Sequence, residues 1–192
     1  YEPEFDQMLF YLPLTGSTFK KVYYDELLGR AVSKFIQAED LIVPYTASSL
    51  EDADAIVHVI KISENDLRKQ QVGGFYRDIE LGDPPINESQ IKTKQLELEG
   101  VTANDQQRES MYTLLEVHTD LDLEDYPDVN ENEEPTGIKL PYIITIDETS
   151  QQVLSIRRNY EPEDPLKKKK NYFVQFKFLP GTGFYGFGLI HM

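Results

Sequence analysis

The sequence predicts an α+β fold that combines antiparallel hairpins and a mixed sheet with short helices. Two observations favour this class. The predicted strands follow one another mostly as hairpins with short turns, and the predicted helices are short and lie between hairpins. A regular strand–helix alternation, which would indicate a doubly wound parallel sheet, does not occur along the chain.

The first element is a predicted helix over residues 5–14, where apolar side chains recur at roughly helical spacing until Pro13 and Gly16 end it. A hairpin follows, whose turn at residues 25–30 contains Gly29. Residues 55–62 alternate well enough for a strand. Ser63 then carries the signal of a helix start, and Gly73 with the next glycine closes that helix.

The second half predicts a strand from residue 111, a hairpin with strands at 142–146 and 153–157, and a last strand over 171–179. Two segments interrupt this pattern. Residues 83–109 form a polar excursion, and residues 124–135 form an acidic loop. We therefore expect one domain over residues 1–192 with these two segments as insertions.

Composition narrows the function. The net charge of −15 repels bare nucleic acid and anionic membranes at long range. The absence of cysteine excludes disulfides, thiolate metal sites and cysteine nucleophiles. No apolar run approaches the roughly 20 residues that a membrane span needs, so no membrane partner is predicted.

Gly181, Gly183 and Gly186 match the string G-x-G-x-x-G after a predicted strand. A dinucleotide fold would continue with a helix and an acidic residue about 20 positions on, and the motif normally opens a strand–helix–strand unit. Here only six residues follow Gly186. We predict instead that these glycines, with Gly188, form a strand-to-helix joint in which glycine supplies positive φ angles and close backbone packing. A dinucleotide or other small-ligand site at Gly181–Gly186 remains the alternative.

An acidic cluster is the candidate for a divalent-ion module, a second alternative. It lacks the glycine at the sixth position that an EF-hand loop needs, which favours a solvated loop. Its residues are Asp120, Asp122, Glu124, Asp125, Asp128, Glu131, Glu133 and Glu134.

The only basic run is Lys167, Lys168, Lys169 and Lys170. These lysines are candidates for contact with phosphates or with a partner. The other interpretation is a solvated face that pairs with Glu161, Glu163 and Asp164.

No enzyme is predicted. His58, His118 and His191 form no metal-ligand motif, and no pattern brings together a nucleophile, a base and an oxyanion donor. His58 lies in an apolar strand and is expected to be a satisfied buried or edge histidine. No cofactor and no metal are predicted.

Three segments carry a resemblance to a known family: LPLTGSTFKKVYYD (12–25), ISENDLRK (62–69) and GFYGFGLIH (183–191). In this order, and with further segments between them, they resemble the portal proteins of tailed double-stranded DNA bacteriophages, most closely the long portals of short-tailed phages. The resemblance covers nearly the whole chain except the polar excursion and the acidic loop.

The resemblance implies a portal wing or body, in a ring that is usually dodecameric and lies at one capsid vertex of the virion. It implies assembly in the host cytoplasm and contacts with terminase, with capsid or scaffold proteins, with tail adaptors and with double-stranded DNA in the channel. We expect a piece of a longer protein, because no Met opens the chain and it stops on an apolar run.

Overall fold

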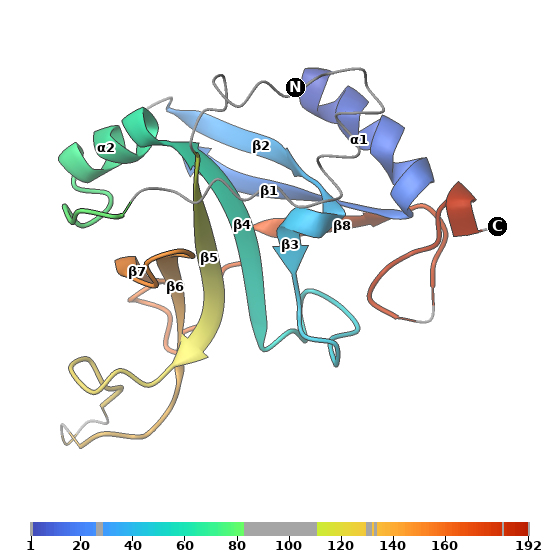
Figure 1. The fold of residues 1–192 in the computed structure, drawn as a ribbon. Coiled ribbons are helices and arrows are strands. Elements are labelled where there is room, and N and C mark those ends of the chain that lie inside the picture. Colours follow the sequence, from blue (N-terminus) through green and yellow to red (C-terminus); the bar gives the residue numbers. More distant parts are fainter. Residues whose placement is uncertain are drawn as a thin grey trace. The chain divides into compact units, whose positions relative to one another are not determined.

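The computed structural model describes residues 2–25, 29–82, 111–129, 132, 134–181 and 183–191. Within these residues it has two α-helices and two antiparallel sheets, so the predicted α+β class is confirmed (Figure 1). Both sheets are antiparallel, where the sequence pattern allowed for a mixed one. The polar excursion at 83–109 lies outside the described residues, as do three positions of the acidic loop.

The smaller sheet has three strands in the order β2-β1-β8. The predicted hairpin is confirmed: β1 (Ser17–Asp25) pairs with β2 (Arg30–Ile36), and Asp25 faces Arg30 across the turn. Gly29 has a φ angle of +59° in this turn, which glycine adopts without strain. The other edge of β1 pairs with β8 (Phe173–Lys177), the predicted last strand.

The larger sheet has five strands in the order β3-β4-β5-β6-β7. Their bounds are β3 (Leu41–Ile42), β4 (Ala55–Ser63), β5 (Met111–Leu121), β6 (Leu140–Asp147) and β7 (Val153–Arg158). A short 3₁₀ helix, η1 (Ala38–Asp40), leads into β3. The predicted second hairpin corresponds to β6 and β7, which are neighbours in this sheet.

Local capping explains the helix ends. α2 (Glu64–Val72) begins as predicted, because the Ser63 hydroxyl accepts a hydrogen bond from the Asp66 N–H at 3.2 Å. α1 (Glu2–Thr15) begins three residues before the predicted range 5–14 and ends one residue after it. Proline lies in the last turn, and the Gly16 N–H still reaches the Leu12 carbonyl at 2.9 Å to close the helix.

The chain forms two compact units, each with its own buried residues. The first comprises residues 1–59, 116–143 and 156–192, and its main core is built around Phe19, Leu41 and Phe173. The second comprises residues 60–115 and 144–155, with a core around Leu114 and Leu154. The single domain expected over residues 1–192 stays a prediction.

α1 covers the outer edge of β2. The Glu4 carboxylate accepts a hydrogen bond from the Phe35 N–H at 2.5 Å, and the Tyr11 ring stacks on the Phe35 ring with centroids 5.7 Å apart. An open strand edge is a template for pairing with another chain. Glu4 therefore satisfies one edge amide that would otherwise be available for such pairing.

Replacing Glu4 with Ala removes this hydrogen bond and leaves the Phe35 amide accessible. Because a hydrogen bond to a charged group contributes about 1.5 kcal/mol, we expect hydrogen exchange at Phe35 to accelerate about tenfold. Amide exchange followed by NMR measures this rate. Asp6→Ala, an exposed acidic position on the same helix, is the control and should leave the Phe35 rate unchanged. Equal rates in both variants would contradict the capping role of Glu4.

Candidate functional site

The glycine-rich segment folds back on itself and onto the N-terminal part of the chain. Leu179 and Phe187 exchange two backbone hydrogen bonds, of 3.2 and 2.9 Å. The Gly186 N–H donates to the Ser17 hydroxyl at 2.7 Å. Gly188 is followed by the 3₁₀ helix η3 (Leu189–His191), which contacts α1 (Figure 1).

At Gly186 and Gly188, the backbone of this segment lies so close to the α1–β1 junction that a side chain would not fit. A methyl group on Gly188 would lie 2.4 Å from the Leu14 carbonyl oxygen, and one on Gly186 would lie 2.6 Å from the Gly16 carbonyl oxygen. Gly16 has a φ angle of +81°, and a methyl group there would lie 2.4 Å from the Gly186 oxygen. We call Gly16, Gly186 and Gly188 the glycine interlock.

The strand-to-helix joint at Gly181, Gly183, Gly186 and Gly188 stays a prediction. Gly181, Gly186 and Gly188 have no positive φ angle, so the expected backbone conformation is wrong at these three positions. Close backbone packing is confirmed at Gly186 and Gly188, and also at Gly181, where a methyl group would lie 2.5 Å from the Tyr185 oxygen. A methyl group on Gly183 would meet no described atom within 4 Å.

A phosphate cradle needs free backbone N–H groups at the start of a helix. Here the Gly186 amide binds Ser17, and the Gly188 amide donates to His191 Nδ1 at 3.1 Å. This geometry favours packing within the chain as the role of the G-x-G-x-x-G string.

Gly188→Ala tests the interlock. The added methyl group meets backbone atoms that cannot move independently, so we expect a loss of about 1–3 kcal/mol in the free energy of unfolding. Gly183→Ala is the matched control, because its methyl group enters open space and should change stability by less than about 0.5 kcal/mol. Urea denaturation of both variants measures the difference, and equal stabilities would contradict the interlock.

The lysine run is largely engaged within the chain. Lys167 pairs with Asp128, Lys170 Nζ lies 2.5 Å from Glu161 Oε1, and Lys169 Nζ donates to the Ala53 carbonyl at 3.3 Å. The expected pairing with Glu161 is confirmed. Contact of Lys167–Lys170 with phosphates or a partner stays a prediction.

Asp164 acts on the backbone of this run rather than on its side chains. Its carboxylate accepts hydrogen bonds from the Leu166 and Lys168 N–H groups at 3.0 and 3.2 Å. These bonds lower the pKa of the Asp164 carboxyl. The turn that carries the lysines is thus held by an acidic residue close in sequence.

One carboxylate of the acidic loop is bound by other residues of the chain. Asp128 accepts hydrogen bonds from Lys167 and from the Thr136 hydroxyl, the latter at 2.7 Å, and these two bonds lower its pKa. Within the described residues, no three acidic or histidine side chains lie close enough to hold a metal ion. Glu131 and Glu133 of the predicted cluster are outside that part of the chain.

A buried group of ionisable residues was not predicted. Lys21 Nζ on β1 lies 2.5 and 2.7 Å from the two carboxylate oxygens of Glu116 on β5. His118 Nε2 lies 2.8 Å from Glu116 Oε1, and His58 Nδ1 on β4 lies 3.9 Å from the same oxygen. We call Lys21, His58, Glu116 and His118 the buried charge cluster.

An aromatic ring packs beside this cluster. Phe173 on β8 makes edge contacts with His118 and His58, at centroid distances of 4.9 and 5.9 Å, and its ring centroid lies 5.9 Å from Lys21 Nζ. The Lys21 and Glu116 side chains are only 14% and 15% exposed, so their attraction is weakly screened. The cluster lies wholly in the first unit and contacts its core.

Electrostatics keep Glu116 ionised. Burial by itself would raise the pKa of the Glu116 carboxyl. The hydrogen bond from His118, the adjacent His58 imidazole and the positive charge of Lys21 outweigh burial and hold this pKa well below its usual range. The arrangement therefore stabilises the ionised form of Glu116.

His58 departs from its prediction in one respect. It is largely buried as expected, but its Nδ1 has no hydrogen-bond partner among the described residues. The available sequence signal for the cluster was the spacing of Glu116 and His118, which alternation places on one face of a strand. Nothing local links that face to Lys21, 95 residues earlier.

Glu116→Gln removes the charge that Lys21 faces, and we expect a loss of about 3 kcal/mol in the free energy of unfolding at neutral pH. In the wild type the folded pKa of Glu116 lies below its unfolded value of about 4.3. Its contribution is therefore present above that pH and is lost progressively as the pH falls below it.

Denaturation at several pH values between neutral and acidic conditions measures both effects. The variant should lose less stability than the wild type on acidification. Glu51→Gln, at an exposed position, is the control and should follow the wild-type pH dependence. A parallel pH dependence in wild type and Glu116→Gln would contradict the assignment.

Comparison with models of known protein families finds no match to this chain, and comparison with curated proteins finds no similar sequence. Among the described helices, none is both long and apolar enough to cross a membrane. A functional proposal therefore depends on this chain's own residues and their arrangement.

Proposed function

We propose that the chain is a structural subunit of a bacteriophage portal, the head-to-tail connector ring that conducts double-stranded DNA during packaging and ejection. In this proposal it assembles into a ring at a capsid vertex, usually of twelve copies in the family it resembles. Terminase, capsid or scaffold proteins and tail adaptors are its partners, and the host cytoplasm is where it assembles.

One observation carries the proposal. Two segments of the portal resemblance, residues 12–25 and 183–191, are far apart in sequence but pack on each other through Gly16, Gly186 and Gly188. Three of the four glycines that these segments contain are therefore explained by one shared structural element. Two resembling segments that pack on each other support a fold shared with the portal family better than two segments that make no contact would.

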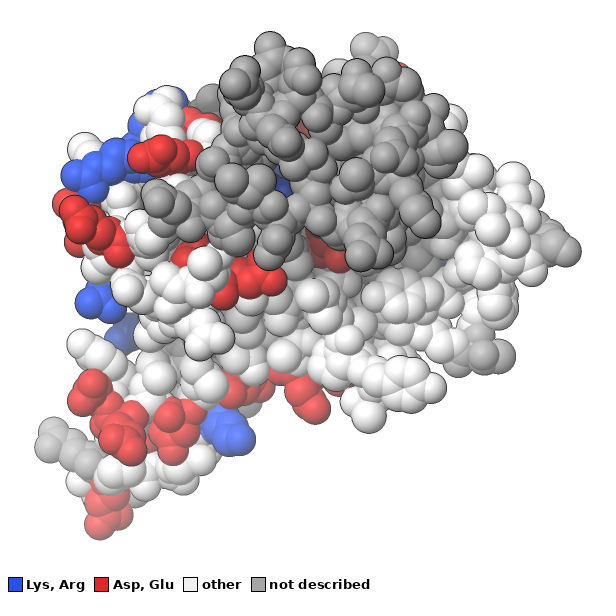
Figure 2. Space-filling view, viewed as in Figure 1, with Lys and Arg blue, Asp and Glu red and all other residues white. Residues whose placement is uncertain are grey.

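Exposed apolar side chains add support for assembly. Phe10 on α1 is 67% exposed, and Ile190 on η3 is 76% exposed. Phe5, Leu9 and Leu189 are also exposed on these two contacting elements. Figure 2 shows uncharged side chains at the right of the visible face, where η3 lies in Figure 1. Exposed apolar surface of this kind is typical of contacts with other proteins.

The polar groups of the site support a structural role. The buried charge cluster is organised around an ionised Glu116, and the lysine run is tied to Asp128 and Glu161. Acidic side chains also gather at the lower left of Figure 2, where the acidic loop lies in Figure 1. An acidic protein suits a conduit in which DNA must slide without binding tightly.

Electron microscopy and native mass spectrometry of the complete protein test the proposal. We expect a closed ring with a central channel and a mass that corresponds to a ring of subunits, twelve in the usual case. A protein that stays monomeric under all assembly conditions would contradict the proposal.

A charged substitution on the apolar surface tests its part in assembly. We expect Phe10→Glu combined with Ile190→Glu to shift the complete protein from rings towards monomers, because burial of an unpaired carboxylate opposes association. Tyr45→Glu, at a fully exposed position on a loop, is the matched control and should leave ring assembly intact. Loss of rings in the control alone would place the contact elsewhere.

A further inference from the structure

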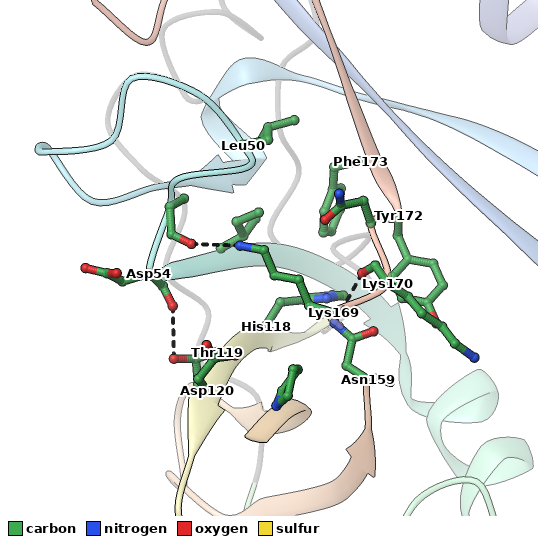
Figure 3. Close-up of a pocket in the computed structure, with 14 residues that line it drawn as sticks. Leu50, Asp54, His118, Thr119, Asp120, Asn159, Lys169, Lys170, Tyr172 and Phe173 are labelled. Carbon is green, nitrogen blue, oxygen red and sulfur yellow. Dashed lines mark hydrogen bonds between the residues drawn. The ribbon is translucent and has the colours of Figure 1, made fainter. Parts of the chain in front are cut away.

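A small cavity lies in the first unit beside His118 and Asn159 (Figure 3). Its volume is about 30 Å³, which exceeds the roughly 10–15 Å³ that a single water molecule requires. It is far smaller than the pockets of several hundred Å³ that hold organic ligands. Size alone therefore restricts its occupant to a water molecule or a small ion.

Asn159 presents an unsatisfied acceptor here. Its side-chain Nδ2 donates to the Lys170 carbonyl at 3.2 Å, which fixes the orientation of the amide because that carbonyl requires a donor. Asn159 is only 3% exposed, and its Oδ1 has no hydrogen-bond partner among the described residues. A buried acceptor without a partner is unfavourable, and ordered water is the usual way in which such a group is satisfied.

His118 also lines the cavity. Its Nε2 lies 2.8 Å from Glu116 Oε1, so this nitrogen is engaged with the carboxylate. The buried acceptor that lacks a partner in this lining is therefore the Asn159 amide oxygen.

The ammonium groups of the lining residues have partners of their own. Lys169 Nζ donates to the Ala53 carbonyl at 3.3 Å, and Lys170 Nζ lies 2.5 Å from Glu161 Oε1. The unpartnered buried atom of the lining is the neutral Asn159 amide oxygen, which the hydrogen of a water molecule can satisfy.

We propose that this cavity is a hydration site for one ordered water molecule, which donates a hydrogen bond to Asn159 Oδ1. Asn159 also binds Pro141 and Lys170 through its backbone, so the hydration site completes the attachment of the segment that carries the lysine run.

A high-resolution crystal structure of the protein decides the question, with one crystal soaked in rubidium chloride and another in sodium bromide. We expect a single density peak within hydrogen-bond distance of Asn159 Oδ1, with no anomalous signal in either soak. An empty cavity, or an anomalous peak from rubidium or bromide, would overturn the proposal.

Asn159→Leu provides the second measurement. It removes the acceptor and fills the space with an apolar side chain of similar size, so the peak should disappear. A peak that persists in this variant would overturn the assignment to Asn159. Should the variant fail to fold, the wild-type crystals still decide between water, ion and empty cavity.

Discussion

The close approach of Gly16 to Gly186 and Gly188 is the constraint on which the first unit depends. It brings the end of α1 and the start of β1 against the segment that follows β8. β1 pairs with β8 from this point, and Phe19 stacks on Phe184 with ring centroids 5.8 Å apart. The main core therefore lies next to a backbone contact that leaves no space for a side chain at Gly16, Gly186 or Gly188.

The buried charge cluster is a second contact that fixes β1 within the first unit. Lys21 follows Phe19 on β1, and its ammonium group reaches Glu116 on β5. Removing one partner of such a pair leaves a buried charge, so the pair requires β1 and β5 to keep their positions. The cluster and the interlock both serve architecture, which agrees with the proposal of a structural subunit.

Features set by neighbouring residues were predictable from the sequence. The turn at Gly29 and the cap at Ser63 depend on local backbone geometry, and both occur where the pattern predicts them. The partners of Lys21 and of Gly186 lie 95 and 169 residues away, and no local pattern specifies them. The G-x-G-x-x-G string was visible, but its packing role required the position of Gly16.

Hydrogen exchange read by mass spectrometry tests the interlock most directly. We predict that peptides covering residues 12–20 and 176–190 exchange together, with equal protection, because they open as one cooperative unit. Fast exchange in the C-terminal peptide while the N-terminal peptide stays protected would contradict this shared opening. It would mean that the glycine-rich segment packs on the first unit without contributing to its stability.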